Sequence, residues 1–266
     1  MSTSAAAASA RPTKPRPSPW RWVIVAAVVA FTWFAAEQTR FSIPELIENF
    51  TRANDLAKEF WPPAWEVARG LVDPFLETIQ IAVIGTIVGC GLAIPLSFLA
   101  AYPTAPGTAV RVISRFSMNI LRTMPDLFWA ILFATAVGFG PFAGAVALSI
   151  FALAIMAKLF SETVDAIETG PLEAVRATGA SRFQAVRRAV WPQVRPNFVA
   201  YAFYIFELLI RASVVLGLVG AGGVGTSLNR WRQFFQYDRV MVLVLITLVI
   251  VLTLEAVGAL VRKRLS

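Results

Sequence analysis

The stretch GLVGAGGVG, from Gly217 to Gly225, carries the most distinctive chemical pattern in the chain. Gly220, Gly222 and Gly225 fit G-x-G-x-x-G, which binds the pyrophosphate of a dinucleotide when it lies between a strand and a helix. The same glycines also approach the G-x-x-x-x-G-K-[ST] pattern of a phosphate-binding loop. Both patterns raise the hypothesis of a nucleotide site.

Residues around the glycines exclude both nucleotide hypotheses. Thr226 occupies the position that needs the phosphate-binding Lys. A dinucleotide site needs an acid about 20 residues further on, where residue 245 is Leu. Two interpretations of the glycines, Gly223 included, remain open. They form either a permissive turn or a non-helical backbone that lines the path of a solute through a membrane.

Composition predicts an all-α polytopic membrane protein. Of the 266 residues, 57% are hydrophobic and 15% are charged, whereas a soluble domain has about 25% charged residues. Residues 79–102 contain no Asp, Glu, Lys or Arg, and a helix of that length crosses a bilayer. The apolar segment 240–261 contains one acid, Glu255.

The residue inventory leaves little room for catalysis on this chain. The sequence has no His and one Cys, Cys90, inside an apolar run. This excludes His-based acid–base chemistry, a Cys/His zinc site and an intrachain disulfide. We therefore expect no catalytic residue and no metal site, and we interpret Cys90 as a small buried apolar residue.

About six apolar segments are predicted to cross the membrane. They lie at about residues 20–36, 75–102, 116–140, 142–160, 197–218 and 240–261. The second contains Gly85-x-x-x-Gly89, a close-packing pattern, and Pro95, which predicts a kink. Met124-Pro125-Asp126 predicts a helix break at the start of the third. The polar stretch 226–239 is expected to be a loop.

The N-terminal region has two possible fates. Residues 1–19 are basic and rich in Ala, Ser and Pro, which predicts a disordered tail. Residues 20–69 then comprise the first span and a connection that carries eight acids and four bases between residues 37 and 77. The first span is either a retained helix or a cleaved signal, and tryptophans near both its ends favour a retained helix.

The distribution of Lys and Arg predicts that both termini are cytoplasmic. One side of the membrane holds sixteen Lys and Arg, in the segments up to residue 21, 103–123, 158–195 and 262–264. The other side holds seven, in 37–77 and 219–239. Because positive residues favour the cytoplasm, the long polar segment 161–195 is expected there and the glycine-rich stretch at the outer face.

Segment 161–195 reads as a short helix, a turn and a second short helix. Pro171 suits the first turn of the first helix, and Gly179 ends it. Ser181 and Gln184 have capping-box spacing for the second helix, which we expect Pro192 to end. Arg182, Arg187 and Arg188 give a basic face opposite an apolar one. Without further information, this pattern is also typical of an amphipathic hairpin on the membrane surface.

This segment resembles the cytoplasmic "EAA" loop of the membrane subunits of binding-protein-dependent ABC importers. The family pattern is E-A-A-x-x-x-G followed, after nine residues, by I-x-L-P. Glu173, Ala174, Gly179 and Pro192 match it in register, whereas Val175, Ala189 and Trp191 depart from it. The departures put the details of partner packing in doubt. The segments EAVRATGASR and FELLIRASVVLGLVGAGGVG look most like the phosphonate/phosphate-type permeases.

The resemblance covers about residues 70–266 and implies a type I ABC importer-like permease fold. It implies a coupling role for Glu173, Ala174, Arg176, Gly179, Ser181 and Pro192, which would dock on a separate ATPase. Expected partners are two ATP-binding cassette subunits, an extracytoplasmic solute-binding protein, a second copy of the chain and membrane lipid, but no nucleic acid. ATP and Mg would bind to the ATPase, no cofactor would bind to this chain, and the location would be the bacterial inner membrane.

Glu207 and Arg211 form the second candidate site. At i and i+4 they face one side of a membrane helix, with Glu N-terminal, which favours pairing. Charges inside a membrane are costly and usually face the bundle interior. Two interpretations stay open: an ion pair that locks two helices, or part of a gate in which Arg211 lowers the barrier for an oxyanion.

The sequence therefore predicts the pore-forming subunit of an importer for a phosphonate or a related oxyanion such as phosphate or phosphite. Alternatives are a permease subunit for another solute, such as methionine, and a stand-alone channel or secondary transporter. The second alternative would need ion-coupling residues near mid-membrane and inverted repeats. The sequence shows no repeat, and its one charged pair of this kind is Glu207–Arg211.

Overall fold

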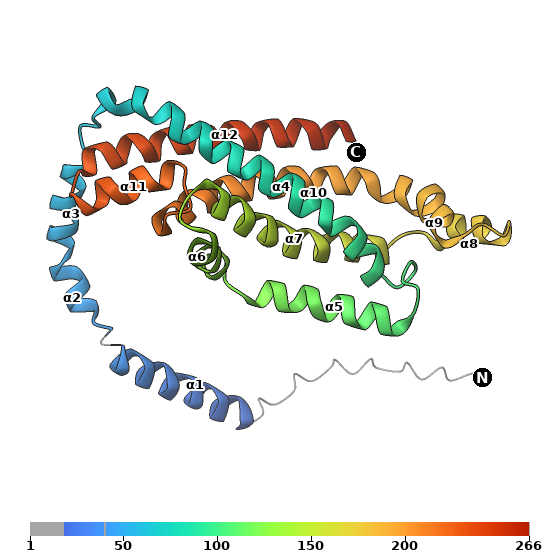
Figure 1. The fold of residues 1–266 in the computed structure, drawn as a ribbon. Coiled ribbons are helices and arrows are strands. Elements are labelled where there is room, and N and C mark those ends of the chain that lie inside the picture. The colour runs from blue at the N-terminus through green and yellow to red at the C-terminus, as the bar shows by residue number, and fades with distance from the viewer. Residues whose placement is uncertain (1–18, 40, 266) are drawn as a thin grey trace, which may run out of the picture. The chain divides into compact units, whose positions relative to one another are not determined.

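The protein is all-helical in a computed structural model that describes residues 19–39 and 41–265 (Figure 1). Within these residues there is no strand, as the sequence predicts. The chain divides into two compact units, the first ending at Lys58 and the second beginning at Glu59. The second unit thus begins before residue 70, where we expected the permease-like core to start. The predicted tail lies, up to residue 18, outside the described residues.

The first unit contains a helix long enough to cross a membrane and two short helices. α1 (Pro19–Gln38) has 20 residues, and none of them is buried. α2 (Ile43–Glu48) begins at Ser42, whose Oγ accepts the backbone N–H of Glu45 at 3.2 Å. α3 (Phe50–Glu59) follows and ends at the boundary between the units. The segment predicted as the first span is therefore helical throughout.

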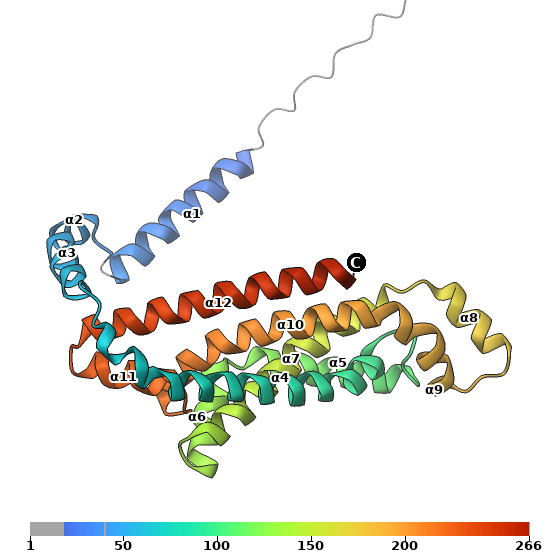
Figure 2. The ribbon, with the colours of Figure 1, turned by 90° about the horizontal axis from the view of Figure 1, so that it is seen from above.

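Four long helices form the second unit (Figure 2). They are α4 (Val72–Ala100), α7 (Pro141–Asp165), α10 (Trp191–Leu216) and α12 (Tyr237–Leu265), and a short 3-10 helix, η1 (Trp65–Leu71), precedes α4. With α1, these give five stretches that are long and apolar enough to cross a membrane. A bent helix pair, described below, makes up to six. The predicted number of spans is confirmed.

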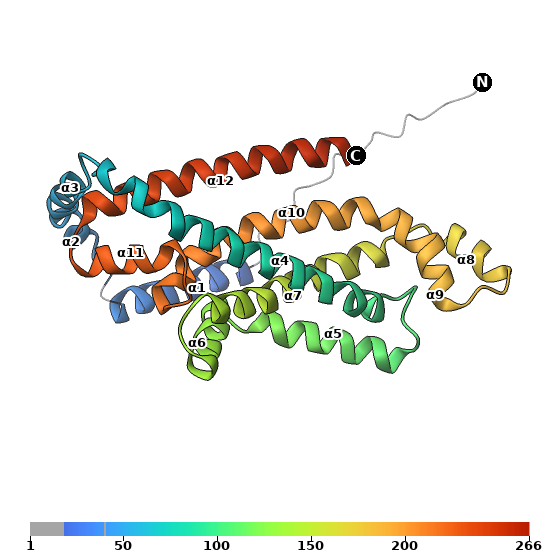
Figure 3. The same cartoon turned by 45° about the horizontal axis from the view of Figure 1, so that its top comes forward.

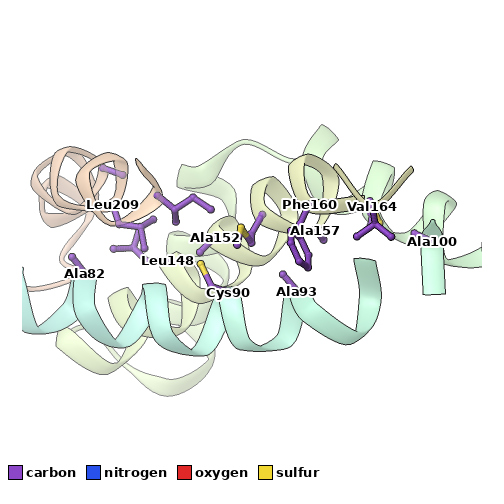
Figure 4. Close-up of a cluster of buried hydrophobic side chains, with 14 of the residues drawn as sticks. Ala82, Cys90, Ala93, Ala100, Leu148, Ala152, Ala157, Phe160, Val164 and Leu209 are labelled. Carbon is purple, nitrogen blue, oxygen red and sulfur yellow. The ribbon is translucent and has the colours of Figure 1, made fainter. Parts of the chain in front are cut away.

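Among the described helices, α4 and α7 share the most extensive contact, and small residues let their backbones approach each other. A Cβ added to Gly89 would lie 2.5 Å from the Cβ of Ala152 and from the carbonyl oxygen of Ser149, both on α7. Figure 4 shows small side chains along this contact, with Leu148, Phe160 and Leu209 filling the space around it. Such packing drives helix association where lipid removes the hydrophobic effect. Cys90 is buried in the same cluster, as expected.

The third span is not the continuous helix that we expected from about residue 116. It consists of α5 (Thr108–Thr123) and α6 (Asp126–Val137), which are bent by 86° at the intervening break. Pro125 supplies the break, because the residue before a proline is held out of the helical region, and Met124 has ψ 129°. The predicted helix break at Met124-Pro125-Asp126 is thus confirmed, and most of the predicted basic loop 103–123 is helix.

Pro192 does not end a helix, contrary to the sequence prediction. The helical path runs from Arg182 to Val219, through α9 (Arg182–Ala185), a π-helical segment, η2 (Val186–Val190), and then α10. The N–H of Trp191 bonds to the carbonyl of Val186, five residues back. This wider turn, directly before Pro192, accommodates a residue that lacks an N–H and would clash within an α-turn. α4 likewise continues past Pro95.

The polar stretch after the glycines is also helical rather than a loop. α11 (Val224–Gln233) follows the short 3-10 helix η3 (Gly217–Val219). Val224, Leu228 and Trp231 recur at helical spacing and pack with Leu71 and Leu243 of the neighbouring elements. A small second core therefore forms between α11, α12, η1 and the start of α4, and burial of this stripe overrides the polar composition.

The two ends of the bundle carry different structures (Figure 3). The end of α4, the loop 101–107, α8 (Thr169–Ala177) and α9 lie at one end. η1, α11 and the turn between α6 and α7 lie at the other. The two candidate regions found in the sequence, segment 161–195 and the glycine-rich stretch, are thus at opposite ends of the bundle.

Candidate functional site

α8 presents its polar face to the outside. Leu172 is buried, with 1% of its surface accessible, whereas Glu173, Ala174 and Arg176 are exposed. α8 begins at Thr169, two residues earlier than Pro171 suggested, so Pro171 lies within the first turn. Leu172 therefore packs α8 against the bundle, and Glu173 stays on the exposed side of the helix.

Gly179 ends α8 as the sequence predicts. Its φ is +77°, in the left-handed region that glycine adopts without a Cβ penalty. Its N–H bonds to the carbonyl oxygen of Arg176 at 3.0 Å, which satisfies one of the acceptors left open at the end of the helix. The turn between α8 and α9 therefore has a defined shape.

The second helix of the segment begins with the predicted capping box. The Oγ of Ser181 accepts the N–H of Gln184, and the Oε1 of Gln184 accepts the N–H of Ser181 at 2.9 Å. Ala185, Ala189 and Val190 are buried against the bundle. The capping box and these contacts hold α9 in a fixed orientation at the end of α10.

Side-chain hydrogen bonds hold the segment against α10 and the loop after α4. Gln193, in the first turn of α10, accepts the N–H of Glu168 at 3.1 Å and donates to its carbonyl at 3.3 Å. Arg176 of α8 donates to the carbonyl of Pro103, in the loop after α4, at 2.6 Å. Gln193 was not identified from the sequence, because nothing in the pattern distinguishes a glutamine that bonds to a distant backbone from an exposed one.

Glu207 and Arg211 form the predicted ion pair. Arg211 Nη1 lies 2.8 Å from Glu207 Oε1, in the half of α10 nearest the glycine-rich stretch. Glu207 is largely buried, with 12% of its side chain exposed, and Arg211 is 45% exposed. Within the described residues, neither side chain has a hydrogen bond or ion pair to another helix. In the single chain, the pair therefore links two turns of one helix and not two helices.

Arg211 borders an open, mostly apolar cavity of about 290 Å³ between α10, α11 and α12, with Thr247 across from it. The exposed guanidinium thus faces a space rather than a packed core.

The glycine-rich stretch is a compact, buried turn. Gly220, Gly222 and Gly223 have φ values of +82°, +84° and +69°, which L-residues with a Cβ rarely adopt. Gly225 and Gly217 pack backbone to backbone, because a Cβ on Gly217 would lie 2.5 Å from the Cα of Gly225. Positive φ values and lack of space therefore both require glycine here.

Thr78 of α4 anchors this turn, and sequence reasoning missed it. The Oγ1 of Thr78 accepts the N–H of Val224 at 2.8 Å and donates to the carbonyl of Pro74 at 2.9 Å. Thr78 is 1% exposed. A threonine at the start of an apolar helix carries no signal of such a partner, which lies 146 residues away in the chain.

A cavity of about 420 Å³ lies beside the turn, between α4 and α7. Glu77, Gln80 and Ser149 are its polar lining residues, and Glu77 and Pro141 also contact the glycine turn at Gly222. Among the described residues, no group of three or more His, Cys, Asp or Glu is arranged to hold a metal ion. The cavity thus joins one acid and two uncharged polar side chains to the glycine-rich turn.

Comparison with known proteins gives one family. Residues 93–266 match the family described as "Binding-protein-dependent transport system inner membrane component". The chain is 35% identical over 218 residues to the phosphite transport system permease protein PtxC of Stutzerimonas stutzeri, covering 82% of this chain and 79% of that one. It is 38% identical over 188 residues to the phosphate-import permease protein PhnE of Mycolicibacterium smegmatis, covering 71% and 35%.

Solved structures agree with the sequence relatives. A chain of the MetNI methionine ABC transporter, in an inward-facing conformation, superposes with a TM-score of 0.64 at 27% identity and covers 74% of this chain and 96% of that one. A chain of a bacterial ABC transporter that imports alginate superposes with a TM-score of 0.59 at 13% identity, covering 90% and 98%, and shows the fold alone.

Proposed function

Since this chain belongs to the family of binding-protein-dependent transport system inner membrane components, we propose that it carries a phosphorus oxyanion across the membrane. The energy would come from ATP hydrolysis by a separate ATPase subunit. The fold of this chain is that of the membrane subunits of type I ABC importers. It is a multi-pass membrane protein of the permease class. The partners, the cargo and the roles of single residues are parts of the proposal.

One observation carries the proposal: α8 and α9 form a rigid, exposed projection at one end of four membrane helices. The projection is held by the capping box, by the buried Leu172 and by the paired hydrogen bonds of Gln193. A rigid element that joins α7 directly to α10 moves both helices when it is displaced. Segment 161–195 is therefore suited to pass the movement of an ATPase to the pore.

We assign the ATP chemistry to a partner. ATP and Mg would bind to two ATP-binding cassette subunits, each docked on one copy of this chain through Glu173, Ala174, Arg176 and Gly179. Two copies would enclose the path, and an extracytoplasmic solute-binding protein would deliver the cargo. Because segment 161–195 then lies in the cytoplasm, both termini do as well, and the protein resides in the bacterial inner membrane.

The cargo is proposed from the relatives and from the charge on α10. Three relatives that are 30% to 38% identical over 71% to 89% of the chain are phosphite and phosphate permeases, and a D-methionine permease matches 70% of the chain at 28% identity. Arg211 supplies an exposed positive charge beside a cavity in the membrane region, and such a charge lowers the barrier for an anion. A phosphonate, phosphite or phosphate ion fits this chemistry, and the zwitterion methionine fits it less well.

Reconstitution tests the function directly. The chain is placed in proteoliposomes with an ATP-binding cassette subunit and a solute-binding protein from the same organism, and uptake of phosphite, methylphosphonate, phosphate and methionine is measured with and without ATP. We expect ATP-dependent uptake of at least one phosphorus oxyanion and no uptake of methionine.

The other outcomes separate the alternatives. ATP-dependent uptake of methionine alone would keep the importer assignment and replace the cargo. Uptake by the chain alone, without ATP, would establish a channel or secondary transporter and contradict the proposed coupling.

A further inference from the structure

Three arginines from three different helices converge on the loop between α4 and α5. Arg115 of α5 donates through Nε to the carbonyl of Ala100 at 2.9 Å. Arg176 of α8 donates to the carbonyl of Pro103 at 2.6 Å, and Arg182 of α9 donates to the carbonyl of Ala105 at 3.1 Å. The short loop 101–107 is thus held at the carbonyls of Pro103 and Ala105 and, directly before the loop, at the carbonyl of Ala100.

Asp165, the last residue of α7, completes the arrangement. Its Oδ1 accepts the N–H of Tyr102 at 2.6 Å, and its Oδ2 pairs with the Nη2 of Arg115. The guanidinium of Arg115 therefore bonds at the same time to the end of α4 and to the end of α7. We call the four side chains Arg115, Asp165, Arg176 and Arg182 the arginine clip.

Helix electrostatics shows why the clip is more than chance surface pairing. The last carbonyls of a helix have no partner within it and carry partial negative charge, so Arg115 stabilises the end of α4 at Ala100. An Asp at a helix C-terminus is locally unfavourable for the same reason. Asp165 nevertheless ends α7, and its contacts to Tyr102 and Arg115 offset this cost. A residue that is locally unfavourable and has partners on other elements points to a tertiary role.

Through the clip, segment 161–195 contacts more helices than those to which it is covalently joined. By covalent connection, α8 and α9 join α7 and α10 only. Through Arg176 and Arg182, the same segment also holds loop 101–107, which connects α4 to α5. At its other end, α4 carries Thr78, which anchors the glycine-rich turn. A path of direct contacts therefore runs from the coupling segment through α4 to the opposite end of the bundle.

We propose that the arginine clip is a set of positioning residues that carries the displacement of α8 and α9 to α4 and α5, so that these helices move together with α7 and α10. This inference rests on the proposed function, since it requires an ATPase that moves α8 and α9. Arg115 and Asp165 lie outside the proposed docking residues, so their substitution leaves the ATPase docking surface around Glu173 intact and separates ATP hydrolysis from the movement of α4.

The test compares Arg115→Gln, Asp165→Asn and the double variant in the full complex in proteoliposomes. ATP hydrolysis and phosphite uptake are measured on the same preparation. The control is Lys158→Gln, which removes a pair of similar length, 2.7 Å to Glu162, that lies within α7 alone. We expect each clip variant to keep hydrolysis and to need about tenfold more ATP per phosphite transported, the scale of a typical coupling energy.

The double variant is expected to equal either single variant, because both substitutions remove one connection. Lys158→Gln should keep the wild-type ratio of ATP to phosphite. Clip variants that match Lys158→Gln, or that lose hydrolysis and uptake in equal proportion, would overturn the inference. If the wild-type complex shows no ATP-dependent uptake of phosphorus oxyanions, the proposed function fails instead, and the two failures are thereby distinguished.

A milder variant covers the case in which Arg115→Gln does not assemble. Arg115→Lys keeps the positive charge beside Asp165, but a single ammonium lacks the planar fork that reaches Asp165 and Ala100 together. We expect this variant to assemble and to show a raised ratio of ATP to phosphite. A wild-type ratio for Arg115→Lys would show that the link to α4 is not needed for coupling and would contradict the inference.

Discussion

The hydroxyl of Thr78 accepts the backbone N–H of Val224 and so joins the start of α4 to the start of α11 across the glycine-rich turn. Thr78→Val preserves shape and removes the acceptor, which leaves a buried N–H without its partner. We expect a loss of about 1–3 kcal/mol in the free energy of unfolding. Thermal unfolding of the purified protein in detergent measures it.

Thr86→Val is the matched control for Thr78. The hydroxyl of Thr86, on the same helix, bonds only to the carbonyl of Ala82 one turn back. We expect a change of less than about 0.5 kcal/mol there, as for substitutions away from buried features. Thr78→Ser should restore most of the stability. Equal effects of the two valine substitutions would show that the link from Thr78 to Val224 does not hold the turn.

Gly89 and Gly91 offer a test of the contact between α4 and α7. An added Cβ meets Ala152 and Ser149 at 2.5 Å from Gly89, whereas from Gly91 it meets nothing within 4 Å. Gly89→Ala should cost about 1–3 kcal/mol through overpacking. Gly91→Ala should be neutral or stabilise by up to about 1 kcal/mol, the helix propensity gain. Unfolding midpoints that rank the two variants the other way would contradict this packing.

Glu173→Arg should abolish ATPase docking without affecting the fold. Glu173 is exposed and has no hydrogen bond or ion pair within the described residues, so reversal of its charge alters a surface and not a core. Co-purification of the ATPase with the tagged chain measures docking. Glu66→Arg, an exposed acid in η1 at the opposite end of the bundle, should retain the ATPase. Normal uptake by Glu173→Arg would remove the coupling role of α8.

Gly179 tests the shape of the turn between α8 and α9. Because its φ is +77°, Gly179→Ala should strain the turn by about 1–2 kcal/mol and lower uptake, and Gly179→Pro should lower it further. Gly170→Ala is the control, since Gly170 is in the same helix without a positive φ or a neighbour within 4 Å. Uptake should fall for the Gly179 variants alone, measured in the reconstituted complex.

Arg211→Gln separates the two interpretations of the charged pair on α10. Arg211→Gln alone leaves the largely buried carboxylate of Glu207 without its partner, so the variant is made together with Glu207→Gln, and loss of both charges should change stability by less than about 1 kcal/mol. We expect the rate of phosphite uptake to fall while the midpoint of thermal unfolding stays unchanged. An equal loss of stability and uptake would favour a structural pair. Lys158→Gln, another i,i+4 pair, controls for surface charge.

Membrane sidedness is checked with reporter fusions. A fluorescent protein fused after residue 266 should fold and fluoresce, because the C-terminus is expected in the cytoplasm. Alkaline phosphatase inserted in the turn after α11, at Phe234, should be active on the outer side. Reversed reporter signals would invert the predicted orientation and with it the coupling role of segment 161–195.

Local patterns in the sequence predicted local structure well. The apolar runs became helices, the Ser181–Gln184 capping box formed, Gly179 adopted a left-handed φ, and Glu207 paired with Arg211. Each of these depends on residues within one helix or one turn. The family resemblance, carried by four residues of segment 161–195, was confirmed by the match of residues 93–266.

The errors and omissions involve packing between distant elements. Pro192 was expected to end a helix, but a π-turn before it keeps the helix continuous, and no residue preference announces such a turn. The polar α11 is stabilised by contacts of Trp231 and Leu228 with other helices. Thr78, Gln193 and Asp165 act through partners more than 20 residues away. Their roles follow from the fold and not from spacing.

The π-turn at residues 186–190 also reconciles Pro192 with the orientation of the projection. A π-turn contains one residue more than an α-turn, so deletion of Ala189 alone would let a regular α-helix run from α9 into α10. Because the wider turn takes up the extra residue, this deletion would leave the face of α9 almost unchanged, but it would place Pro192 within a regular α-turn, where its ring clashes with the carbonyl four residues back. The extra residue therefore removes the proline clash while α9 keeps its face toward the loop 101–107.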